Sequence, residues 1–120
     1  MSKLVLVVED QEDNRRILRD LLASGGFDIL EAENGEEALK AVTKRPDLIL
    51  MDIQLPVMDG YEATRRIKAN PEFHSIPIIV VTSYALSGDE EKARAAGCDA
   101  YFTKPYSPRQ LLAAVREFLT

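Results

Sequence analysis

The sequence predicts an α/β protein with a doubly wound, five-stranded parallel sheet and five helices. Short apolar runs rich in β-branched residues alternate five times with longer segments of helical periodicity. The runs are too continuously apolar for half-exposed strands, and they suit parallel strands that helices cover on both faces. Five such units joined by right-handed crossovers most simply give the strand order 2-1-3-4-5.

In the first half of the chain, strands are expected at residues 4–8, at residues 27–32 and from about Leu48. The helix between the first two has one apolar stripe and ends at the Gly25-Gly26 pair. Asn34 can cap the second helix, because its side chain can accept a hydrogen bond from a free backbone N–H of the first turn. This half therefore contains two complete β-α units and a third strand.

The second half repeats the pattern. Strands are expected at residues 78–81 and 100–103. Ser87 and Glu90 form a capping-box pattern at the start of the fourth helix, and Ser107 is placed to cap the fifth. The chain thus supplies all five units of the predicted sheet.

Length and composition predict one domain, residues 1–120, with no output domain. A chain of 120 residues with 46% hydrophobic residues can bury one continuous core. A formal net charge of −5 argues against nucleic acid and against anionic membranes as partners, because both bind through Lys and Arg.

Nothing in the sequence predicts membrane insertion or export. The apolar runs are far shorter than the ~20 residues that a membrane helix needs, and no signal-peptide pattern opens the chain. Cys98 is the only cysteine, so no internal disulfide can form, and it is expected to be a small buried residue. We expect a cytoplasmic protein.

Charged side chains follow three of the apolar runs. Glu9 and Asp10 follow the first, Asp52 ends the third and Lys104 follows the fifth. Because the carboxyl ends of parallel strands share one edge of the sheet, these side chains should converge there. Carboxylates about 4 Å apart repel by roughly 4 kcal/mol at an effective dielectric of 20, and a bound Mg²⁺ would remove this repulsion.

This arrangement is suited to phosphoryl transfer. With Asp52 as nucleophile, an in-line attack would form an aspartyl phosphate while the metal and Lys104 neutralise the phosphoryl oxygens. Thr82, at the end of the fourth strand, would add a hydroxyl donor to the same oxygens.

The segments that carry these residues resemble a known family, the receiver domain of two-component response regulators. The matching segments are VVED (7–10), LMDIQLP (50–56), MDG (58–60), VTS (81–83) and YFTKP (101–105). The resemblance covers the whole chain, and it implies the flavodoxin-like, CheY-like fold. Within the family the chain is similar to stand-alone, single-domain regulators of the CheY-like and DivK-like types.

The resemblance implies a role for each matching residue. Asp52 would be the phosphoacceptor, Lys104 the phosphate contact, and Thr82 and Tyr101 the switch residues. The metal ligands for Mg²⁺, or alternatively Mn²⁺, would be Glu9, Asp10, Asp52 and the main-chain carbonyl of Gln54. The Lys104-Pro105 bond would be cis, and Gln54 and Tyr84 would flank the water path and tune the dephosphorylation rate.

These roles describe a phosphorylation-dependent signalling switch. The phosphoryl group would come from a phosphohistidine on a histidine kinase or a histidine phosphotransfer protein, and the signal would pass to a downstream protein target. Self-phosphorylation and slow autodephosphorylation are expected, so the chain would not be a conventional enzyme. We expect a monomer, with a dimer as the other state, and neither nucleic acid nor membrane as a partner.

Two other functions fit parts of the sequence. A small phosphatase would use Asp10 as its nucleophile, but such enzymes have a second Asp two residues later, where this chain has Glu12, and the chain has no cap domain. A receiver-like binding module that is never phosphorylated is the other, although no expected chemical residue is missing.

Each site residue also has a purely structural interpretation. Glu9 and Asp10 can cap the first helix, and Lys104 with Pro105 can form a plain strand-to-helix turn. Tyr101 can be a core aromatic, Thr82 an ordinary strand residue and Asp52 a solvated acid in a loop.

Overall fold

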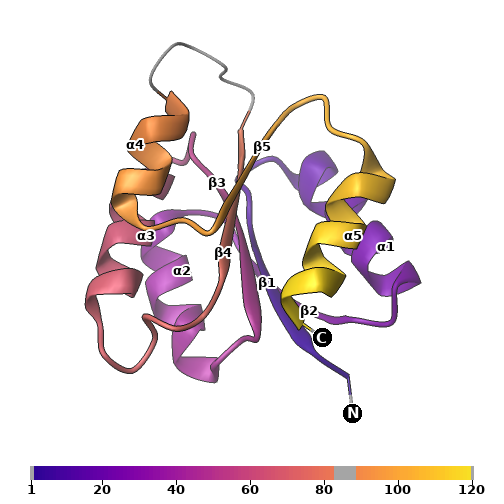
Figure 1. Ribbon diagram of the computed structural model, residues 1–120, viewed down its shortest axis with the longest axis horizontal. Helices are drawn as coiled ribbons and strands as arrows, with labels where there is room; N and C mark the ends of the chain where they lie inside the picture. The colour runs from indigo at the N-terminus through magenta and orange to yellow at the C-terminus, as the bar shows by residue number, and fades with distance from the viewer. Residues whose placement is uncertain (1, 83–88, 120) are drawn as a thin grey trace.

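The computed structural model describes residues 2–82 and 89–119 and contains one five-stranded parallel sheet (Figure 1). Its strand order is β2-β1-β3-β4-β5, as predicted. The strands are β1 (Leu4–Val8), β2 (Asp28–Ala32), β3 (Leu48–Asp52), β4 (Ile78–Thr82) and β5 (Ala100–Thr103). The order reverses between β1 and β3, so the side chains that follow these two strands lie next to each other.

Helices cover both faces of the sheet. The helices are α1 (Glu12–Ser24), α2 (Gly35–Ala41), α3 (Gly60–Ala69), α4 (Asp89–Ala96) and α5 (Pro108–Leu119). Figure 1 shows α1 and α5 on one face and α2, α3 and α4 on the other. No helix within residues 2–82 and 89–119 is long and apolar enough to cross a membrane.

The sheet divides the core into two clusters, because successive side chains of a strand point to opposite faces. In β1, Leu6 and Val8 pack on the side of α2, α3 and α4, whereas Val5 and Val7 pack on the side of α1 and α5. All four side chains are at most 1% exposed. Both faces of the strand are therefore buried, which explains its uninterrupted apolar sequence.

The ends of the elements mostly follow the predicted signals. Asn34 caps α2 by accepting a hydrogen bond from the Glu37 N–H at 2.8 Å, and Ser107 Oγ accepts one from the Gln110 N–H at 3.3 Å. The second strand begins at Asp28 and not at Phe27, because the Phe27 N–H bonds back to the Leu22 carbonyl at the end of α1.

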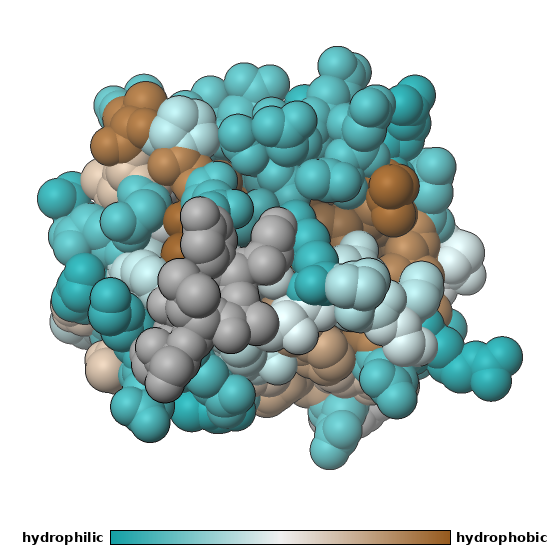
Figure 2. Space-filling view, turned by 90° about the horizontal axis from the view of Figure 1, so that it is seen from above, coloured by the Kyte–Doolittle hydropathy of each residue, from teal (hydrophilic) through white to brown (hydrophobic). Residues whose placement is uncertain are grey.

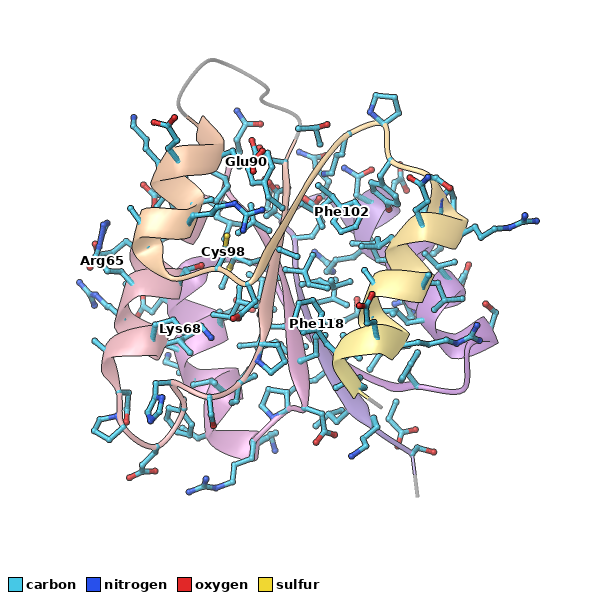
Figure 3. All side chains as sticks on the ribbon, viewed as in Figure 1. Arg65, Lys68, Glu90, Cys98, Phe102 and Phe118 are labelled. Carbon is cyan, nitrogen blue, oxygen red and sulfur yellow. The ribbon has the colours of Figure 1, made fainter. Side chains whose placement is uncertain are left out.

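Two local features concern the end of α2 and the position of Cys98. An unpredicted 3-10 turn at Val42–Lys44 prolongs α2 and ends at Arg45 with φ of 56°. Cys98 is buried as expected, and Figure 3 shows it on the α3 and α4 side of the sheet, opposite Phe102 on the α5 side. The predicted capping residue Ser87 lies outside the described residues.

Candidate functional site

The ends of four strands bring the predicted site residues to one edge of the sheet. Glu9 and Asp10 directly follow β1, Asp52 ends β3, Thr82 ends β4 and Lys104 follows β5. The strands are parallel, so all four reach the same edge, which Figure 2 shows face-on. This convergence was expected from the sequence, and the distances come from the structure.

Three carboxylates form a cluster at this edge. One oxygen from each of Glu9, Asp10 and Asp52 lies within 4.8 Å of the others. Glu9 is 1% exposed and Asp52 is 7% exposed, so water shields their charges poorly. Burial raises the pKa of the Asp10 carboxyl, and the hydrogen bond and the negative charge of Glu9 raise it further. The cluster therefore has an unbalanced negative charge that favours a cation.

Lys104 supplies one positive charge to the cluster. Its Nζ donates to Glu9 Oε1 at 2.8 Å and to Asp52 Oδ2 at 3.3 Å. Burial alone would lower the pKa of this ammonium, but the hydrogen bonds and charges of Glu9 and Asp52 outweigh burial and raise it. Lys104 is therefore fully protonated at neutral pH. The Lys104-Pro105 peptide bond is cis.

Backbone N–H groups fix the other oxygens of two of the carboxylates. The Gln11 N–H donates to Glu9 Oε2 at 3.1 Å, and the Gln54 N–H donates to Asp52 Oδ1 at 3.0 Å. Helix α1 itself begins with Gln11 as N-cap and has no side-chain cap hydrogen bond. Glu9 thus turns towards Lys104 and the loop, and it does not cap the first turn of α1.

The donor set fits a small divalent cation. Mg²⁺ prefers oxygen ligands, binds through one or two carboxylates and keeps several waters, and three carboxylates converge here. Asp10 is partly exposed, so an ion can approach its carboxylate from solvent. With two carboxylates already bonded to Lys104, a divalent ion would share these oxygens with the ammonium.

The loop after Asp52 packs so tightly that glycine is required at Gly60. A Cβ atom there would lie 2.1 Å from the Asp52 carbonyl oxygen and 2.8 Å from Ile53 Cα. The Gly60 N–H donates to the Ile53 carbonyl at 2.9 Å, which folds the start of α3 back onto the end of β3. Gly60 belongs to the MDG segment (58–60), but the segment alone does not indicate this close packing.

The same loop contains a strained turn centred on Val57. The Met58 N–H donates to the Pro56 carbonyl at 2.7 Å, which closes a three-residue turn with Val57 at φ of 69°. Positive φ is costly for a β-branched residue, and this side chain is 77% exposed. Nothing in the sequence marks Val57, because its positive φ depends on the path of the loop.

Comparison with known proteins identifies the family. Residues 5–116 match the family described as the response regulator receiver domain. The chain belongs to this receiver-domain family. It is 44% identical over 120 residues to the polar-differentiation response regulator DivK of Brucella anthropi, a match that covers 99% of this chain and 98% of the relative.

Solved receiver structures have the same fold. The receiver domain of the sensor histidine kinase PA1611 from Pseudomonas aeruginosa, solved with a magnesium ion coordinated in its active-site cleft, is 35% identical with a TM-score of 0.91 and coverage of 99% and 98% of the two chains. The chemotaxis protein CheY4 of Vibrio cholerae is 27% identical with a TM-score of 0.91 and coverage of 98% and 99%. The fold is thus the expected flavodoxin-like, CheY-like fold.

Membership of the family gives the general function. The chain is a receiver domain of a two-component system, a DivK-like response regulator that acts as a phosphorylation-dependent signalling switch. Receiver domains generally bind Mg²⁺ at an acidic cluster and interact with histidine kinases and downstream proteins. Neither the phosphatase nor the unphosphorylated binding module is favoured.

The structure also gives positions for Thr82, Tyr101 and Gln54 in this receiver domain. Thr82 is buried at the end of β4, and its carbonyl accepts a hydrogen bond from the Lys104 N–H at 2.7 Å. Tyr101, on β5, is partly buried against the core cluster on the α2, α3 and α4 side. The Gln54 side chain is exposed, and Tyr84 lies outside the described residues.

Proposed function

We propose that Asp52 is the phosphoacceptor of this receiver domain. An Asp52 oxygen attacks the phosphorus of a phosphohistidine in line, the P–O bond forms as the P–N bond breaks, and the imidazole leaves with the bonding electron pair. Supporting this choice, Asp52 is 7% exposed and receives hydrogen bonds from Lys104 and the Gln54 N–H. The carboxylate is therefore held in one orientation.

The acidic cluster is the proposed metal site. Glu9, Asp10 and Asp52, together with the Gln54 main-chain carbonyl, would hold Mg²⁺ or Mn²⁺. The bound ion would neutralise the phosphoryl oxygens and reduce the repulsion between the carboxylates. Two observations support this proposal: the convergence of the three carboxylates within 4.8 Å and the magnesium ion in the PA1611 receiver domain.

Lys104 and Thr82 are proposed to hold the transferred group. The Lys104 ammonium lies 3.3 Å from Asp52 Oδ2, so it can move from this carboxylate to an equatorial phosphoryl oxygen with a small displacement. Thr82 is placed at the neighbouring strand end and would donate its hydroxyl. Both residues would bind the phosphorylated state more strongly than the resting state, which is what moves a two-state equilibrium.

The conformational change on phosphorylation would be transmitted from Thr82 to Tyr101. Movement of the Thr82 hydroxyl towards the phosphoryl group would free space for Tyr101 to turn inward, and this would change the surface of α4, β5 and α5. Gln54 is exposed next to Asp52 and, with Tyr84, is proposed to limit the access of water to the aspartyl phosphate.

We further propose that residues 1–120 act as a single cytoplasmic receiver unit. Its phosphodonor would be a histidine kinase or a histidine phosphotransfer protein, and its output a complex with a downstream protein. The similarity to DivK over 99% of the chain supports this assignment.

One mass measurement tests the proposed phosphoacceptor. The purified chain is incubated with acetyl phosphate, with and without Mg²⁺, and its intact mass is recorded. We expect one added phosphoryl group in the presence of Mg²⁺ and none in Asp52→Asn. Asp20→Asn is the matched control, because Asp20 is an exposed acid on α1 away from the cluster. A phosphoryl group on Asp52→Asn would assign the chemistry to another residue.

A further inference from the structure

Arg15, in the first turns of α1, lies against the loop that presents Glu9 and Asp10. Its Nη1 donates to the Glu9 carbonyl at 3.0 Å and to the Asp10 carbonyl at 3.3 Å. The side chain is only 12% exposed, which is low for a charged residue near the start of a helix. One guanidinium nitrogen thus contacts both peptide groups that orient the proposed metal-binding pair.

Two acidic residues, one on β2 and one directly after it, hold the guanidinium in place. Arg15 Nε donates to Glu31 Oε1 at 3.2 Å, and Arg15 Nη2 lies 3.4 Å from Glu33 Oε1. The planar fork of arginine can serve the two carbonyls and the two carboxylates at once, which a single ammonium cannot do. Arg15 therefore ties the β1–α1 loop to the end of β2.

The charges around Arg15 balance locally. Arg19 also pairs with Glu31, through Nη1 and Oε2 at 3.0 Å, so two guanidinium groups face the two carboxylates. The ion pairs with Glu31 and Glu33 thus largely cancel the electrostatic effect of the Arg15 charge on the acidic cluster. Its influence on Glu9 and Asp10 comes mainly from geometry, through the two carbonyl hydrogen bonds.

We propose that Arg15 is a positioning residue of the metal site, acting through the Glu9 and Asp10 main-chain carbonyls to hold the Asp10 carboxylate in its ligating direction. The inference rests on the proposed Mg²⁺ site. Residues that orient metal ligands typically contribute about tenfold or more to metal affinity. Arg15 makes no contact with Asp52 or Lys104 among its hydrogen bonds and ion pairs within residues 2–82 and 89–119.

The test measures Mg²⁺ binding to the unphosphorylated protein by isothermal titration calorimetry. Arg15→Gln removes both the charge and the carbonyl contacts, whereas Arg15→Lys keeps the charge and loses the fork. Arg19→Gln is the matched control, since Arg19 shares Glu31 with Arg15 but donates to neither carbonyl in the described part of the chain. Circular dichroism at the titration temperature verifies that each variant is folded.

We expect Arg15→Gln to weaken Mg²⁺ binding about tenfold, Arg15→Lys to fall between it and the wild type, and Arg19→Gln to stay within about twofold. At saturating Mg²⁺ the acetyl phosphate reaction of both Arg15 variants should return close to the wild-type rate, because the Asp52 and Lys104 contacts are unchanged. A variant that is only less stable would not combine a weaker Mg²⁺ affinity with a normal reaction rate at saturating Mg²⁺. If Arg15→Gln does not fold, Arg15→Lys carries the same comparison.

Two results would overturn the inference while leaving the metal site intact. One is unchanged Mg²⁺ affinity in the folded Arg15 variants, and the other is an equal loss in Arg19→Gln, which would assign the effect to the ion pairs with Glu31. A wild-type protein that binds no Mg²⁺ would instead refute the proposed metal site, and the positioning role with it.

Discussion

The Lys104 ammonium lies 2.8 Å from Glu9 Oε1, although 95 residues separate the two in sequence. This distance is shorter than the 3.3 Å between the ammonium and Asp52 Oδ2. In the unphosphorylated protein Lys104 is thus held most closely by Glu9, one strand away from the proposed phosphoacceptor. Glu9 thereby keeps a partly buried cation within reach of Asp52 before any phosphoryl group arrives.

Replacing Lys104 should destabilise the protein, because it leaves two buried carboxylates without their cation. We expect Lys104→Met to lower the free energy of unfolding by about 2 kcal/mol at neutral pH without Mg²⁺. Urea unfolding measures this loss. Added Mg²⁺ should stabilise the variant more than the wild type, since it would no longer share the carboxylate oxygens with an ammonium.

Lys92→Met is the control for that comparison. Lys92 is an exposed lysine on α4, and its replacement should change the free energy of unfolding by less than about 0.5 kcal/mol. If Lys104→Met were as stable as Lys92→Met, the hydrogen bonds of Lys104 would contribute little to the fold.

Gly60 should tolerate no side chain. In Gly60→Ala the new Cβ would lie 2.1 Å from the Asp52 carbonyl oxygen, so the loop must move away from the end of β3. We expect a loss of about 3 kcal/mol in urea unfolding, together with slower phosphorylation by acetyl phosphate. Gly26→Ala provides the comparison, because Gly26 has φ of +87° and no atom within 4 Å of an added Cβ. Its cost should be only about 1 kcal/mol, from backbone strain.

Val57 should be replaceable with a gain in stability. Its φ of 69° is unfavourable for valine, and its 77% exposed side chain buries little surface. Glycine accepts this conformation without a Cβ clash, so Val57→Gly should raise the free energy of unfolding by about 1 kcal/mol, after allowing for the greater freedom of glycine in the unfolded chain. A lower urea midpoint in Val57→Gly would show that the valine side chain makes a contact worth more than the strain.

Cys98 should make stability depend on alkaline pH. Burial raises the pKa of its thiol, so the folded protein keeps this proton at a pH where the unfolded chain loses it. The contribution of this thiol to the free energy of unfolding is complete below the ordinary thiol pKa of about 8.5. It is lost as the pH rises through the raised pKa of the folded protein. Urea unfolding under reducing conditions should therefore show the wild type losing stability relative to Cys98→Ala above about pH 8.5.

If the difference in free energy of unfolding between the wild type and Cys98→Ala stayed constant as the pH rose through this range, the Cys98 prediction would be refuted. Thiol alkylation offers a second measurement, since the thiolate is the reactive form. At pH 8 the native protein should react about tenfold more slowly than the urea-unfolded chain.

Much of the site could be predicted from the sequence because the fold is made of parallel strands. Once the apolar runs at residues 4–8 and 48–52 are assigned as strands, Glu9 and Asp52 must lie at the same edge of the sheet. No such rule links a helix residue to the loop before it. Arg15 therefore carried no signal beyond being an arginine in the first turns of a helix, and its two carbonyl contacts became visible only in three dimensions.

The architecture, the strand order and the convergence of the carboxylates with Lys104 follow from the sequence. Side-chain periodicity reveals the strands, and parallel strands all end at the same edge of a sheet. How these groups divide their hydrogen bonds depends instead on packing in three dimensions. Lys104 bonds most closely to Glu9, Gly60 packs on the Asp52 carbonyl, and Arg15 holds the β1–α1 loop. Such choices depend on distances of a few ångströms between elements far apart in the chain, and these distances are set only when the helices pack on the sheet.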